Sequence, residues 1–244
     1  MTIEPARDVR GVTADERAWF VAGVLLIAAC LVTAFSVMRQ WSLCGASPTS
    51  SECVALQQTM NMLPIQADTM ALRVPWTATL AALGLTLATC AWIAFLLLHP
   101  LGRGIKIAGA IVAVPLLIMS IGGWFGVWFV EGWVAYGGAW IILGTISEFL
   151  AIGFLVYATM SRDAVNLSTT QRLVVLIFGV TAFGTMHQSA EFILFALFDQ
   201  ASQAVPRYLG LGTAVTLGLT GAAVVWLTLR ARKKPRRHEV SILG

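Results

Sequence analysis

The chain is organised around six long apolar runs, which alternate with short segments where charged and small polar residues gather. Each run is close to the ~20 residues that an α-helix needs to cross the ~30 Å hydrocarbon layer of a bilayer. The runs are Trp19–Met38, Pro75–Leu98, Lys106–Val130, Ala139–Met160, Arg172–Leu197 and Tyr208–Leu229. Lipid offers no partner for backbone N–H and C=O groups, so each run must be helical. The pattern predicts an all-α, polytopic integral membrane protein: a six-helix transmembrane bundle, with its clearest kink at Pro115.

The composition favours a membrane protein over a soluble one. Hydrophobic residues make up 58% of the 244 residues, charged residues make up 11%, and the mean hydropathy is +0.80. A soluble domain of this size could not bury so much apolar surface in one core, so the excess must face lipid. We therefore expect three parts: a leader (1–18), a transmembrane domain (19–229) and a basic tail (230–244).

The basic residues are distributed asymmetrically between the segments that join the spans. With six spans, every Lys and Arg except Arg39, Arg73 and Arg207 falls on the side of the two termini. Because Lys and Arg collect on the cytoplasmic side, we expect both termini in the cytoplasm. From the compactness of the chain and its short termini, we expect the cytoplasmic (inner) membrane of a bacterium. The tail RARKKPRRHE suits anionic lipid headgroups. It has no interleaved aromatic residue on which bases could stack, which argues against nucleic acid.

The outer loop, residues 39–74, contains two cysteines. Cys44 and Cys53 would face an oxidising compartment, and we expect a structural disulfide between them. Apolar residues then recur at helical spacing up to Leu63, which predicts a short amphipathic helix at the membrane surface. A redox role is the alternative for the cysteines, but membrane thiol oxidoreductases rely on a Cys-x-x-Cys pair and the chain has none.

Aromatic residues gather where the third and fourth spans meet on the outer side. The group surrounds Glu131 and includes Trp124, Trp128, Trp133 and Trp140. Such rings favour the boundary between membrane and water, so an anchoring belt is one interpretation. The density of tryptophan also suits an outer surface that binds lipid or a partner protein.

Three polar residues at a similar depth interrupt the fourth and fifth spans. They are Glu148, His187 and Glu191, and Gln188 adds polarity beside them. His187 and Glu191 are four residues apart, so they share a helix face and could hydrogen-bond to each other. Three interpretations remain open: a structural clasp between two spans, a proton- or cation-coupled transport site, and a metal or haem site. One histidine with two carboxylates is a thin ligand set, so we expect no metal and no cofactor.

Small residues repeat every four positions along the last span. Gly210, Ala214, Gly218 and Ala222 predict a close helix crossing, either inside the bundle or against another subunit.

The chain lacks the common signatures of catalysis. It has no phosphate-binding glycine loop, no Gly-x-Ser-x-Gly elbow and no HExxH motif, so we do not expect an enzyme. We expect a non-catalytic subunit or accessory protein of a larger, transport-related membrane assembly, which would dock through the Gly/Ala face or the aromatic outer surface. The alternative is a self-sufficient transporter of small solutes or ions that uses the Glu/His cluster.

Overall fold

The described part of the chain is entirely helical. The computed structural model describes residues 14–42, 76–128, 137–160, 167–198 and 210–233, which form seven helices and no strands. The helices are α1 (Ala14–Trp41), α3 (Thr77–Leu98), α4 (Arg103–Trp128), α5 (Gly137–Met160), α6 (Leu167–Val180), α7 (Thr185–Phe198) and α8 (Leu211–Lys233). The prediction of an all-α fold is confirmed for these residues.

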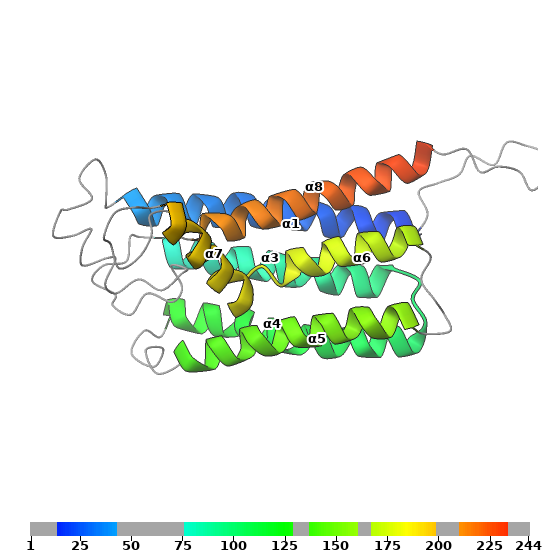
Figure 1. Ribbon diagram of the computed structural model, residues 1–244, viewed down its shortest axis with the longest axis horizontal. Helices are drawn as coiled ribbons and strands as arrows, with labels where there is room; N and C mark the ends of the chain where they lie inside the picture. Colours follow the sequence, from blue (N-terminus) through cyan, green and yellow to red (C-terminus); the bar gives the residue numbers. More distant parts are fainter. Residues whose placement is uncertain (1–13, 43–75, 129–136, 161–166, 199–209, 234–244) are drawn as a thin grey trace, which may run out of the picture.

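Most of these helices are suited to crossing a bilayer. Within the described residues, α1, α3, α4, α5 and α8 are long and apolar enough to do so, and α6 with α7 makes a sixth span if the pair counts as one. The long helices lie side by side along one axis, and their colours show that successive helices alternate in direction (Figure 1). As a result, α1 begins and α8 ends at the same end of the bundle.

The core of the bundle lies around α1 and α3. α1 packs closely against α3 and α8, while α4 packs on α3 and α5 packs on α4. Large aromatic side chains fill the space between them, with Trp19, Trp92 and Phe95 fully buried. The ring of Trp19 lies 4.5 Å from that of Phe95, measured between centroids, so α1 and α3 are joined by aromatic packing.

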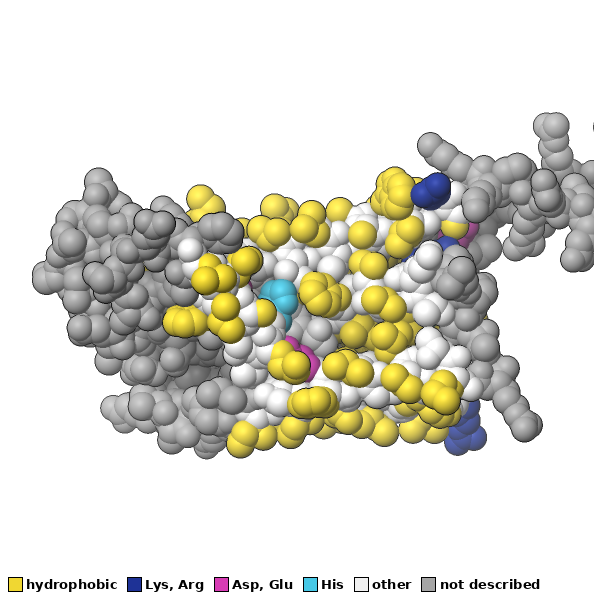
Figure 2. All heavy atoms as spheres, viewed as in Figure 1, with side chains coloured by type: hydrophobic (Ala, Val, Ile, Leu, Met, Phe, Trp, Pro, Cys, Tyr) yellow, Lys and Arg dark blue, Asp and Glu magenta, His cyan; other side chains and the backbone are white. Residues whose placement is uncertain are grey.

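The outward faces of the helices are apolar. On α4 the exposed side chains recur every three or four residues, as in Ile107, Ile111, Val114, Ile118 and Ile121. Figure 2 shows such hydrophobic side chains along the length of the visible face, with Lys and Arg near the end where α1 begins. Apolar surface of this kind is stable against lipid and costly in water, which fits a multi-pass membrane protein.

The fifth predicted span differs from its prediction. Arg172–Leu197 was expected to be one helix, but α6 and α7 are separate and meet at a bend of 76°. The break contains no proline, while Pro115 lies inside α4, which remains a single helix. Non-helical backbone at bilayer depth is tolerated only where the protein supplies hydrogen-bond partners for it. We therefore expect polar groups of the protein beside the break.

Several predicted features lie outside the described residues. These are the Cys44–Cys53 disulfide, the short amphipathic helix of the outer loop, Glu131 and Trp133. Trp128 is the last residue of α4, and Trp140 lies in the first turn of α5.

Candidate functional site

Glu148 of α5 caps the beginning of α7. Its side chain is buried, and its Oε2 and Oε1 atoms accept hydrogen bonds from the backbone N–H groups of Met186 (2.9 Å) and His187 (3.0 Å). The first N–H groups of a helix have no partner within the helix. A side chain of the residue before the helix usually fills this role, but here that residue is Gly184. A carboxylate from a neighbouring helix takes its place.

Gly184 makes room for this carboxylate. A Cβ atom at Gly184 would lie 2.4 Å from the Oε1 atom of Glu148. Among the described glycines only Gly210 has a left-handed φ, so the need for glycine at position 184 is one of space. The side-chain amide of Gln188 donates to the carbonyl oxygen of Phe183 at 3.0 Å, which satisfies an acceptor inside the break.

Glu191 of α7 caps α8 in the same manner. Its Oε1 atom accepts from the N–H groups of Gly210 (2.6 Å) and Gly212 (2.8 Å). Its Oε2 atom accepts from the N–H group (2.9 Å) and the hydroxyl group (3.0 Å) of Thr213. Four bonds use the full acceptor capacity of an ionised carboxylate. A Cβ atom at Gly212 would lie 2.7 Å from Cδ of Glu191, so this glycine also provides space.

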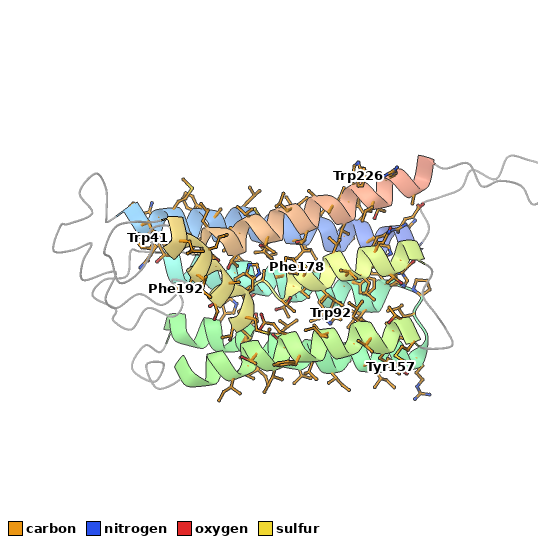
Figure 3. All side chains as sticks on the ribbon, viewed as in Figure 1. Trp41, Trp92, Tyr157, Phe178, Phe192 and Trp226 are labelled. Carbon is orange, nitrogen blue, oxygen red and sulfur yellow. The ribbon has the colours of Figure 1, made fainter. Side chains whose placement is uncertain are left out.

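His187 takes a different partner from the one its spacing suggests. Its Nε2 atom lies 3.2 Å from the hydroxyl oxygen of Thr216 on α8. The ring stands edge-on to Phe178, with 5.8 Å between the centroids, and Figure 3 shows Phe178 on α6 near the bend. His187 and Glu191 therefore both hydrogen-bond to α8, and the direct bond between them that the four-residue spacing allowed is replaced by these contacts.

Together the polar residues form a chain of caps through three helices. α5 supplies the carboxylate for α7, and α7 supplies the carboxylate for α8. A negative charge at a helix N-terminus is stabilised by the exposed N–H groups and by the helix dipole. The structure thus brings Glu148, Gln188 and Glu191 to the beginnings of helices. The arrangement holds the beginnings of α7 and α8 inside the bundle.

A second polar cluster lies where α1 begins, and its contacts are not predicted by the hydropathy pattern. Asp15 Oδ1 is 2.5 Å from Nε2 of the buried His99, and it accepts a hydrogen bond from the indole of Trp19 at 3.0 Å. The guanidinium of Arg172 lies 4.0 Å from Asp15 Oδ2 and 5.8 Å from the Trp19 ring. In the sequence Asp15 lies in the leader, His99 follows the second apolar run and Arg172 begins the fifth, and hydropathy does not predict contacts between such positions.

The close crossing of α8 uses a face shifted from the predicted one. Gly210 and Ala214 are buried, but Ala222 is exposed. The nearest approach to α1 is at Gly221, where a Cβ atom would lie 2.8 Å from the carbonyl oxygen of Gly23. About one turn earlier on α8, a Cβ atom at Gly218 would lie 2.8 Å from the sulfur of Cys30 on α1. Part of the Gly/Ala face therefore packs inside the bundle, and Ala222 remains on the surface.

Trp124 is half-buried between α4 and α3. Its indole N–H donates to the hydroxyl oxygen of Thr86 at 2.9 Å, and that oxygen lies 2.8 Å from the hydroxyl oxygen of Ser120. This tryptophan thus links two helices. Its predicted part in an outer lipid- or partner-binding surface stays a prediction.

Among the side chains that the structure describes, no group of three His, Cys, Asp or Glu residues could hold a metal ion. Comparison with known proteins found no matching family, no similar curated sequence and no similar solved structure.

Proposed function

We propose that this protein is a non-catalytic subunit or accessory protein of a larger, transport-related assembly in the cytoplasmic membrane. One observation supports this above the others: the two buried carboxylates at bilayer depth are used as helix caps. Glu148 accepts from two backbone N–H groups of α7, and Glu191 accepts from two of α8 and from that of Gly210 just before it. Carboxylates that relay protons need freedom to exchange partners, whereas these are engaged in holding the bundle together.

The proposed topology counts α6 and α7 as one crossing, which makes six. Both termini would then lie on the cytoplasmic side, together with every basic residue except Arg39, Arg73 and Arg207. Juxtamembrane cations at the tail would attract anionic lipid headgroups.

Partner subunits would dock on the membrane-exposed surface of the bundle. Ala222 supports this idea, because a small residue exposed on α8 lets another helix approach closely. The aromatic outer surface around Trp128 and Trp140 is the other proposed docking region.

A second function, a self-sufficient transporter of small solutes or ions, is favoured by one observation. The span formed by α6 and α7 is broken, and in many secondary transporters discontinuous helices surround the substrate site at the bilayer midplane. The half-buried His187 would be the exchangeable group, because its 3.2 Å contact with the Thr216 hydroxyl is longer than the hydrogen bonds that hold Glu148 and Glu191.

The two proposed functions predict opposite results for proton uptake by the purified chain. We would purify the protein in mild detergent and reconstitute it alone in liposomes loaded with a pH-sensitive dye. Under an imposed membrane potential, an accessory subunit should give proton uptake no faster than empty liposomes. Uptake above that level, lost in a well-folded His187→Ala variant and kept in Ser189→Ala on the same helix, would overturn the proposal in favour of transport.

The assembly itself needs a positive test. Native membranes solubilised in the same detergent should yield the chain with other subunits at fixed stoichiometry through two chromatographic steps. A monodisperse single chain that remains alone under these conditions would contradict the proposed role.

A further inference from the structure

The bend between α6 and α7 is held by side chains outside the bend. The residues between the helices, Thr181 to Gly184, include no proline, and Gly184 has no left-handed φ. The backbone turns through bonds from the N–H of Ala182 to the carbonyl of Gly179 (3.2 Å) and from Gly184 to Thr181 (2.7 Å). Sharp bends usually have a proline or an inserted group as their cause. Here the inserted group is the carboxylate of Glu148, which lies at the beginning of α7.

α7 is attached to the bundle by polar contacts. Of its side chains whose burial the structure describes, the buried ones are Gln188 and Glu191. Its apolar side chains Met186, Ile193 and Leu194 are exposed. Among the described side chains, apolar packing therefore adds little to the position of this helix. The Glu148 cap at its beginning and the bonds from Glu191, near its middle, to the start of α8 determine it.

A straight helix would satisfy the same backbone groups in another way. If α6 continued into α7, the N–H group of Met186 would pair with the carbonyl of Ala182, four residues earlier, and that of His187 with Phe183. Glu148 would then lose both of its donors, and Glu191 would move away from α8. Two backbone arrangements thus exchange one set of hydrogen bonds for another, as expected of an element with two discrete states.

We propose that α6 and α7 form a conformational switch between this bent state and a straight state in which they run as one helix. Glu148 selects the bent state by occupying the N-terminus of α7. The titratable residues of α7, His187 and Glu191, would move with it. The straight state withdraws α7 from α8 and opens the end of the bundle where α8 begins. The switch is independent of the function proposed above.

The two states differ in a distance that can be measured. Genetically encoded spin labels at the exposed positions Gln171 and Leu197 would leave the native cysteines in place. At ~1.5 Å per residue, their backbones are about 39 Å apart along a straight helix, and about 31 Å apart when the axis bends by the observed angle. Electron–electron double resonance in lipid nanodiscs resolves this difference.

Removing the cap should populate the straight state. Glu148→Ala should shift the main distance upward by about 8 Å, as the helix rise requires. Ser147→Ala is the matched control, because this buried neighbour donates only within α5, to the carbonyl of Gly144. Gly184→Ala should also lengthen the distance, since the added Cβ occupies the space of the Glu148 carboxylate.

The proposal is overturned if both variants fold and keep the shorter distance, because the bend would then be intrinsic to the segment. Gly184→Ala decides the matter if Glu148→Ala alone does not fold. Failure of both variants to fold also counts against the switch, since a two-state element has a second folded state.

Discussion

At the scale of single residues, the buried glutamates show how a carboxylate is accommodated at bilayer depth. Each of them faces backbone N–H groups that would otherwise have no partner. A clasp between side chains would tolerate an amide in place of the acid. At Glu191 a glutamine would offer one oxygen and point its NH₂ group at further donors, so this substitution is not conservative here.

We predict that Glu191→Ala lowers the free energy of unfolding by about 2 to 3 kcal/mol, because the first turn of α8 is left with buried donors that have no partner. The comparison is Ser189→Ala, an exposed position two residues away on α7. Thermal unfolding in detergent measures both. Equal stability of the two variants would show that the cap contributes nothing.

Some of the site was predictable from residues and some was not. Glu148, His187 and Glu191 could be recognised as polar residues inside apolar runs, but the depth expected for His187 and Glu191 assumed a straight fifth span, and α6 and α7 are bent by 76°. The partners of the two glutamates could not be predicted, because their carboxylates bind main-chain N–H groups. Every residue except proline has such a group, so the sequence does not distinguish the ones that are bound. The Asp15–His99 pair was hidden for a similar reason: both residues flank apolar runs, where hydropathy cannot distinguish a buried pair from a solvated loop.

At the scale of helices, the crossing of α1 and α8 depends on one contact between glycines. Gly221 lies against the backbone of Gly23, so neither position has space for a side chain. The four-residue repeat of small residues predicted a close crossing but could not indicate which side of it faces inward, because Gly221 stands directly beside Ala222.

Gly221→Ala should therefore destabilise the bundle by about 1 to 3 kcal/mol, the usual cost of overpacking against a backbone that cannot move aside. Ala222→Leu, one residue along and exposed, should change the stability of the isolated chain by less than about 0.5 kcal/mol. Melting temperatures in detergent test the pair. A larger loss at position 222 would mean that α8 is rotated relative to this structure.

The bend between α6 and α7 marks the limit of prediction from helical pattern. Apolar residues continue through Val180 and Phe183, and no proline interrupts them, so the pattern indicates one span. At the break a carboxylate on another helix accepts from the start of α7, a tertiary contact that no local pattern encodes.

At the scale of the whole molecule, the asymmetry of basic residues leads to a definite arrangement in the membrane. Reporter fusions or cysteine accessibility should place Met1, Arg162 and Gly244 in the cytoplasm, and Ser50 and Asp199 outside. A C-terminus found outside would contradict the count of six crossings. It would imply that α6 and α7 enter and leave on the same side.

The order of the two caps along the chain has a consequence for biosynthesis. Glu148 precedes the helix that it caps, and Glu191 precedes α8. A helix emerging into the bilayer with bare N–H groups at its beginning would be costly to leave in lipid. In this protein each capping carboxylate is translated before the N–H groups that it binds. The beginning of each late helix can therefore be capped by a helix that is already inserted.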